Sequence, residues 1–159
     1  MPTTKKTPFP LLKASAIASM QEIRRVHRLN PRAVRNGKSL GDAVGMTDMG
    51  IHLVRIKSGD ETTEFHTHYC EEEFLFILSG RGIAEIGKRK LKVGAGDFMG
   101  FTAGSLPHAM SNPHKEDLVY LMGGTRRPID VSDYPRARIR YYRFEGKRNR
   151  VKFEDITDA

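Results

Sequence analysis

Metal-binding side chains gather in one short stretch, residues 66–73, which reads H-T-H-Y-C-E-E-E. In a β-strand successive side chains point to opposite faces, so His66 and His68 lie on one face and can share an ion. Glu73 comes five residues after His68, which is the wrong parity for one straight strand. A short reversal through residues 69–72 resets that parity and lets Glu73 begin the next strand, facing the same interior.

A third histidine comes from a distant part of the chain. His108 lies 40 residues after His68 and follows a glycine turn at Gly104. Three neutral imidazoles and one carboxylate suit a divalent transition metal ion such as Mn, Fe, Co, Ni, Cu or Zn. Around a six-coordinate ion, four protein ligands leave two positions open for a substrate or for dioxygen. The predicted ligands are His66, His68, Glu73 and His108.

Such a site needs strands that close on each other, and the sequence from residue 50 onward predicts them. Short runs rich in Ile, Val, Leu, Phe and Tyr alternate with glycine turns, which indicates an antiparallel sandwich or barrel. Gly87-Lys88 is a predicted tight hairpin, since glycine permits positive φ. The predicted strands are 51–56, 64–68, 73–78, 82–86, 90–93, 98–102, 108–112, 118–122 and 138–144.

The two flanks of this region have a different character. Residues 14–28 predict a short helix that ends at Asn30-Pro31, because the residue before proline disfavours helical geometry. Residues 32–39 predict an extended basic arm, and residues 128–135 predict a loop before the last strand. The expected organisation is therefore an N-terminal arm over 1–40, a barrel over 41–125, and a C-terminal loop, closing strand and tail over 126–159.

The net charge of +8 is concentrated in the flanks. Residues 1–40 hold nine Lys or Arg and one acidic residue, residues 126–159 hold ten and six, and the middle of the chain is acidic. Basic flanks can bind polyanions. No nucleic-acid-reading motif accompanies the charge, so solvated arms or subunit contacts are the preferred interpretation and nucleic acid is an unlikely partner.

Size and targeting signals point to a small protein of the cell interior. The 159 residues suit one domain with one core. No apolar run approaches the roughly 20 residues that span a bilayer, and residues 1–10 lack the apolar core of a secretory signal. The single cysteine allows no intrachain disulfide. We therefore predict a reducing, cytoplasmic location and no membrane partner.

Two spaced motifs resemble those of the cupin superfamily. The first reads Gly59, six residues, His66-x-His68, four residues, Glu73, six residues, Gly80. The second reads Gly96, five residues, Thr102-x-Gly104, three residues, His108, three residues, Asn112. Gly59 and His108 each lie one residue further from their neighbours than in the family pattern, and Thr102 replaces a proline. These departures change loops rather than ligands. The family also tolerates Glu72 as the acidic ligand, but the spacing to Gly80 favours Glu73.

The resemblance extends to a narrower group of small bacterial and archaeal cupins. It is carried by residues 40–55, by G-D-F-M-G-F and by residues 123–135. Some members of that group are named as candidate sugar-phosphate isomerases. The resemblance implies an all-β double-stranded β-helix, or jelly-roll barrel, with a central metal and a homodimeric assembly. It does not settle an activity.

Two classes of function remain open at this point. The favoured one is a metal-dependent enzyme on a small polar or anionic metabolite, using isomerase-like Lewis-acid chemistry or dioxygenase chemistry. Glu71 or Glu72 could then serve as the general base, although a solvated acidic turn explains them equally well. The alternative is a non-catalytic module that binds or senses a small ligand in the same cavity, because a ligand set does not fix a reaction.

Overall fold

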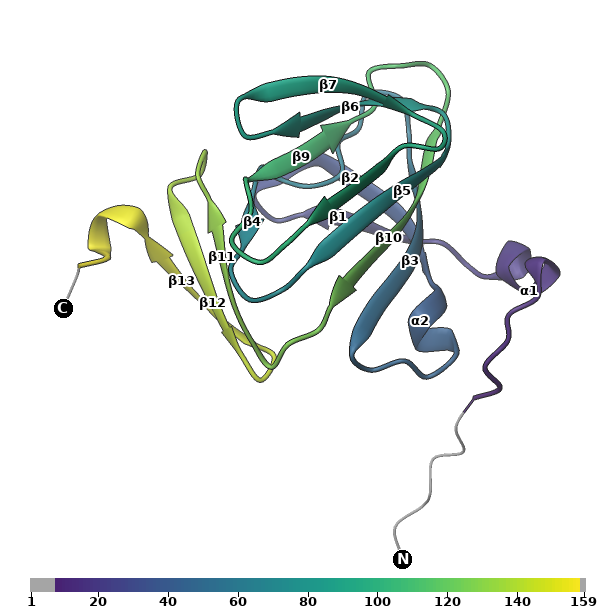
Figure 1. Cartoon of the computed structure of the whole chain (residues 1–159), viewed down its shortest axis with the longest axis horizontal. Helices are drawn as coiled ribbons and strands as arrows, with labels where there is room; N and C mark the ends of the chain where they lie inside the picture. Colours follow the sequence, from purple (N-terminus) through teal and green to yellow (C-terminus); the bar gives the residue numbers. More distant parts are fainter. Residues whose placement is uncertain (1–7, 158–159) are drawn as a thin grey trace, which may run out of the picture.

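The computed structural model describes residues 8–157, and nearly all of its regular structure is β-strand (Figure 1). Two short α-helices and one 3-10 turn complete it. The elements in chain order are α1 (Ala14–Ser19), β1 (Ile23–His27), β2 (Asn30–Ser39), α2 (Leu40–Ala43), β3 (Met49–Ile56), β4 (Thr67–His68), β5 (Glu73–Ser79), β6 (Arg81–Ile86), β7 (Arg89–Gly94), β8 (Phe98–Phe101), β9 (His108–Ser111), β10 (Leu118–Thr125), β11 (Ile129–Tyr134), β12 (Ile139–Phe144), β13 (Lys147–Lys152) and η1 (Phe153–Asp155).

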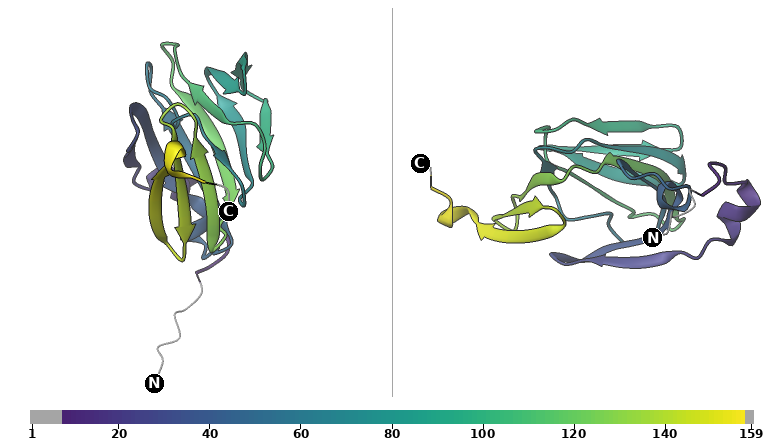
Figure 2. Two further views of the ribbon diagram at one scale, coloured as in Figure 1. Left: turned by 90° about the vertical axis from the view of Figure 1, so that its left-hand side faces the viewer. Right: turned by 90° about the horizontal axis from the view of Figure 1, so that it is seen from below.

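The strands form three antiparallel sheets. The largest has the order β1-β2-β3-β10-β5-β8, the second β13-β12-β11-β4, and the third β7-β6-β9. Strands distant in sequence are neighbours, since β10 pairs with both β3 and β5. Figures 1 and 2 show the large sheet curving against the β6, β7 and β9 layer, with β11, β12 and β13 at the side opposite α1. The predicted all-β jelly-roll barrel is confirmed.

The apolar core lies between the large sheet and the three-stranded sheet of β6, β7 and β9. Tyr120 of β10 stands opposite Val54 of β3 and Ile77 of β5, so the three side chains stack across the middle of the sheet. Alternation explains the inward set, because Leu75 and Ile77 of β5 are buried while Phe76 between them is exposed. The core also contains Ile56, Phe101, Met110 and Leu118.

Glycines close the turns that the sequence predicted for them. Gly87 has φ of +57° in the turn between β6 and β7, which confirms the predicted hairpin. Gly80 has φ of +79°, and a Cβ built on it would lie 2.3 Å from the carbonyl oxygen of Asp117. The chain can pass this closely between β5 and β6 only because position 80 carries no side chain.

The helix predicted over residues 14–28 is shorter than expected. Helix α1 ends at Ser19, and residues 23–27 form strand β1 instead. Isoleucine and valine favour strands. Pairing with β2 also gives the backbone N–H and C=O groups of β1 their hydrogen-bond partners. The described residues contain no helix long and apolar enough to cross a membrane.

The basic N-terminal segment is joined to the barrel by backbone hydrogen bonds. Strand β2 pairs with β3 from Asn36 to Ser39, so β1 and β2 extend the large sheet at one edge. The ring of His27 lies 5.5 Å from that of Tyr134 on β11. Residues of β1 and β2 also form one wall of the cavity described below.

The loop predicted over residues 128–135 is wrong. Residues 129–134 form strand β11, which pairs with β12 on one side and with β4 on the other. The two prolines, Pro128 and Pro135, flank the strand rather than interrupt it. Asp130 and Ser132 are buried while Ile129 and Val131 are less so, which is the alternation of a strand whose inward face is polar. Asp133 and Tyr134, at the end of the strand, are both buried.

Candidate metal centre

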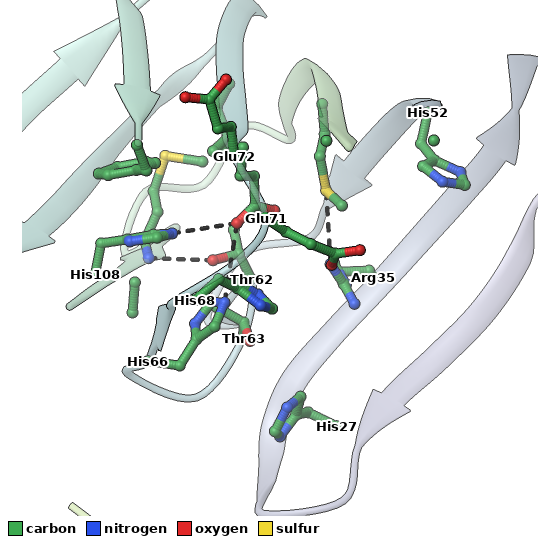
Figure 3. A pocket seen from close by; sticks show the side chains of 18 of the residues that line it. His27, Arg35, His52, Thr62, Thr63, His66, His68, Glu71, Glu72 and His108 are labelled. Atoms are coloured by element: carbon green, nitrogen blue, oxygen red, sulfur yellow. Dashed lines mark hydrogen bonds and ion pairs between the residues drawn. The ribbon is translucent and has the colours of Figure 1, made fainter. Parts of the chain in front are cut away.

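Three of the four side chains predicted as metal ligands, His66, His68 and Glu73, bring their donor atoms together, and His108 contacts Glu73. Figure 3 shows His66, His68 and His108 gathered on one side of the pocket. The Glu73 carboxylate oxygen Oε2 lies 3.2 Å from Nε2 of His108 and 3.9 Å from Nε2 of His66. Donor atoms of His66, His68 and Glu73 all lie within 4.8 Å of one another. His66 and His68 come from β4 and the residue before it, whereas Glu73 opens β5 and His108 opens β9, so only the closed fold assembles the cluster.

Backbone pairing positions two of the imidazoles. His66 and His108 form an isolated antiparallel bridge, with both backbone N–H groups donating to the other residue's carbonyl at 3.1 and 2.8 Å. His108 stacks on Phe101 with ring centroids 3.5 Å apart, and His66 stacks on Tyr134 at 5.5 Å. These contacts fix the orientation of both imidazole rings at the base of the cavity.

Hydrogen bonds at the other ring nitrogens leave Nε2 available. Nδ1 of His66 donates to the carbonyl of Glu64 at 2.9 Å, and Nδ1 of His68 donates to the Asp130 carboxylate at 2.7 Å. A histidine whose Nδ1 carries the proton presents a lone pair at Nε2, which is the arrangement found in metal sites. The chemistry of this donor set therefore fits a divalent ion.

The charge states of the cluster also suit a cation. Burial lowers the pKa of His66 to about 3, so its ring is neutral at ordinary pH. Burial opposes ionisation of Glu73, but the hydrogen bond with His108 and the adjacent His66 outweigh it and lower the carboxyl pKa to about 2. A neutral imidazole beside an ionised carboxylate is the protonation state in which both bind metal.

Glu73, and not Glu72, supplies the carboxylate of the cluster. Glu73 opens strand β5 with the same inward orientation as Leu75, whereas Glu72 is exposed. The Glu71 carboxylate lies near His68 and Asp130, where it accepts a hydrogen bond from the backbone N–H of Arg127 at 2.7 Å and forms an ion pair with Arg143. Parity along the strand thus separates three consecutive glutamates into different roles.

Asp130 is the residue of the site that the sequence analysis missed. It forms a second group of metal-binding types with His68 and Glu71. Its 2.7 Å contact is to Nδ1 of His68, so its carboxylate orients that ring rather than completing the first cluster. The available signal was the polar inward face of residues 129–134, which was interpreted as a loop.

The cluster opens into a cavity of about 370 Å³, a size suited to a small metabolite. Met99, Phe101 and Met110 form an apolar part of its wall. The opposite part is polar and comes from the N-terminal strands, where Figure 3 shows His27, Arg35 and His52 across the cavity from the clustered histidines. The buried hydroxyl of Tyr120, in the same wall, has no hydrogen-bond partner within residues 8–157.

Comparison with known proteins agrees with the fold. Residues 52–124 match the family described as Cupin domain. A crystal structure from Acidithiobacillus ferrooxidans, named as a candidate sugar phosphate isomerase, has 45% sequence identity and a TM-score of 0.92, covering 94% of this chain and 96% of that one. The chain belongs to the cupin superfamily.

A more distant structure supports the same fold. It is a sugar phosphate isomerase of the cupin superfamily from Silicibacter pomeroyi, with 23% identity and a TM-score of 0.77 over 87% of this chain and 92% of that one. A comparison with curated proteins found no match.

Removing the Asp130 carboxylate will weaken metal binding although Asp130 is not in the ligand cluster. The Asp130→Asn variant keeps the side-chain shape but loses the charge that orients His68. Loss of such an outer partner typically costs 10–100-fold in metal affinity, and we expect a decrease in that range. Competition with a fluorescent chelator measures it. Asp155→Asn, at η1 outside the cavity, is the control, and equal affinities of the two variants would contradict the role given to Asp130.

Metal affinity will fall on acidification near neutral pH. Burial lowers the pKa of His68, but the hydrogen bond to Asp130 and the charge of Glu73 raise it more, so the net pKa lies above its ordinary value of 6.5. Below that pKa a proton must leave His68 before metal binds, so affinity drops about tenfold per pH unit. Above it, this residue contributes no further pH dependence. Chelator competition between about pH 5.5 and 8.5 measures how metal affinity depends on pH. An affinity that stays constant over this range would contradict the prediction.

Proposed function

We propose that this protein is a metal-dependent isomerase of a small phosphorylated sugar. The observation that carries the proposal is the convergence of His66, His68, Glu73 and His108 at the base of a cavity of metabolite size. These four residues would hold one divalent transition metal ion of the Mn, Fe, Co, Ni, Cu or Zn series. The sugar-phosphate substrate class is suggested by the relative with 45% identity.

The metal would act as a Lewis acid toward neighbouring oxygens of the substrate. The chain's own groups would then bind the sugar and move a proton. Burial of Glu73 and His66 keeps bulk water from the base of the cavity. The apolar side chains of Met99 and Phe101 would confine the carbon chain, which favours a short polyhydroxylated substrate over a bulky one.

Glu72 is the better of the two candidates for the proton-transfer base. The carboxylate of Glu71 is already occupied by Arg143 and by the N–H of Arg127. Glu72 lines the cavity, and none of residues 8–157 forms an ion pair with its carboxylate. Its backbone is fixed, because its N–H and carbonyl both bond to Thr125 at 2.9 and 3.0 Å. A carboxylate free of ion pairs, on an anchored backbone that borders the cavity, could move a proton between adjacent carbons of a bound substrate.

We also propose a cytoplasmic homodimer. Strand β1 is an edge of the large sheet, and a strand of a second copy could pair with it. Ile23 and Val26, 54% and 44% exposed on opposite faces of β1, would then be partly covered. Light scattering after gel filtration measures the assembly. A dimer that Ile23→Lys converts to a monomer supports β1 as the contact, and a wild-type monomer contradicts it.

The function is tested by metal analysis followed by assay. Purified protein loaded with each candidate metal is incubated with aldose and ketose phosphates, and interconversion is followed by NMR. We expect turnover that chelator abolishes, and a decrease of at least about 100-fold in kcat for Glu72→Gln, the range assigned to a general base. Glu61→Gln, at a pair outside the cavity, is the control. Metal binding without turnover would instead favour a ligand-binding module.

A further inference from the structure

Three arginines face the same cavity as the metal centre without a carboxylate partner. Arg25 comes from β1, Arg35 from β2 and Arg148 from β13, and all three line the cavity. None of them forms an ion pair with any residue of 8–157, although nine other basic residues in that span do. The three belong to the basic flanks, which the sequence analysis interpreted as solvated arms or subunit contacts.

Their positions bring like charges together. Arg25 stands directly opposite Arg35 in the β1–β2 pair, and Arg148 stands directly opposite Arg143 in the β12–β13 pair. Like charges directly opposite each other destabilise an antiparallel pair. Glu71 offsets the charge of Arg143, but Arg25, Arg35 and Arg148 have no such partner among residues 8–157, which indicates a site that is completed by a negative charge from outside the chain.

The acidic residues of the cavity do not neutralise this cluster. Glu71 pairs with Arg143 and Glu73 belongs to the metal centre. A further cavity arginine, Arg126, is neutralised by Asp42 at 2.6 Å. Glu72 is the remaining acid of the lining, against three unpaired guanidinium groups. The surplus is therefore positive on the side of the cavity formed by the N- and C-terminal strands.

Arg35 lies deepest of the three. Its guanidinium crosses β3 and reaches Sδ of Met122 on β10 at 3.6 Å, a weak contact that leaves its N–H groups unused. Figure 3 shows it between His27 and His52, across the cavity from the metal cluster. The charges of Arg35 and Arg148 also lower the pKa of His27, after burial, which places both near that ring.

We propose that Arg25, Arg35 and Arg148 form an anion subsite that binds the phosphate group of the substrate, while the metal centre takes its other end. Planar guanidinium groups match phosphate oxygens with paired, charge-assisted hydrogen bonds. A dianion would offset the repulsion within the cluster more completely than a carboxylate. The assignment to substrate rests on the proposed function, but anion binding itself does not.

Inorganic phosphate is the probe, and calorimetry at constant ionic strength measures its binding to the full chain, as purified and after chelator treatment. We expect saturable binding in both states. Arg25→Gln, Arg35→Gln and Arg148→Gln should each weaken it at least about tenfold. The control Arg24→Gln removes the same charge from the residue next to Arg25, which β-strand alternation turns to the other face, and should change binding less than twofold.

A second measurement separates a specific site from damage to the fold. Because like-charge repulsion is relieved, Arg25→Gln and Arg148→Gln should leave Tm equal to or above that of the wild type while phosphate binding falls. Absence of saturable binding, equal weakening by Arg24→Gln, or acetate binding as tightly as phosphate would each overturn the proposal.

The two proposals fail in different ways. Arginine-dependent phosphate binding without isomerase turnover would keep the subsite and remove the reaction. Turnover of sugar phosphates with KM unchanged in all three arginine variants would keep the reaction and remove the subsite.

Discussion

His66→Ala will lower the affinity for a divalent metal by more than about 100-fold. Removing a residue that only orients a ligand typically costs about 10–100-fold, and the loss of a ligand itself should cost more. The variant removes a buried neutral imidazole whose Nε2 lies 3.9 Å from the Glu73 carboxylate. Chelator competition and elemental analysis of the purified protein measure the change.

The fold itself will tolerate this substitution. The metal-free variant loses the hydrogen bond to Glu64 and the stacking on Tyr134, which together cost about 1–2 kcal/mol, or roughly 2–6 °C in Tm. His114→Ala, in the turn after β9, is the matched control and should retain the metal. Normal metal content in His66→Ala, or unfolding as severe as that of the core variant below, would refute the arrangement.

Ile77→Ala will produce the opposite pattern, with a large loss of stability and little change in the ligands. Ile77 is 0% exposed and packs in the core cluster with Tyr120 and Leu118. Truncating such a residue costs about 2–5 kcal/mol, because the transfer energy is lost and a cavity remains. We expect Tm of the metal-free protein to fall by roughly 5–15 °C.

The neighbouring residue provides the control for that experiment. Leu78 is 45% exposed on the same strand, so Leu78→Ala should cost less than about 1 kcal/mol. Below its Tm, Ile77→Ala should still bind metal, since Glu73 lies four residues away at the start of β5. Similar Tm values for the two alanine variants would show that the core is not where the burial pattern places it.

Local sequence rules determined the strands of the barrel and the clustering of the histidines. Alternation along a strand places His66 and His68 on one face, and it carries Glu73, Leu75 and Ile77 inward on the next strand. Glycines at turns with positive φ, such as Gly80 and Gly87, mark where strands end. These features depend on residues close in sequence, so they can be predicted from it.

Alternation and turn chemistry did not identify what β11 contributes. Residues 129–134 look like a loop because prolines flank them, yet pairing with β4 makes them a strand and brings Asp130 to Nδ1 of His68. The same holds at the N-terminus, where pairing with β2 ended the predicted helix at Ser19. Backbone groups take the partners that the assembled sheet offers, and those partners are distant in sequence.

The sequence by itself determined the residue types of the site, the parity that groups them and the jelly-roll class of the barrel. Only the tertiary structure decided that Asp130 orients His68 and that Arg25, Arg35 and Arg148 share a cavity with the metal centre. The physical reason is that a count of charges along the sequence does not say which way the side chains point or which of them meet in the fold. Two basic flanks form one positive surface only when the fold brings strands of two different sheets to the same cavity.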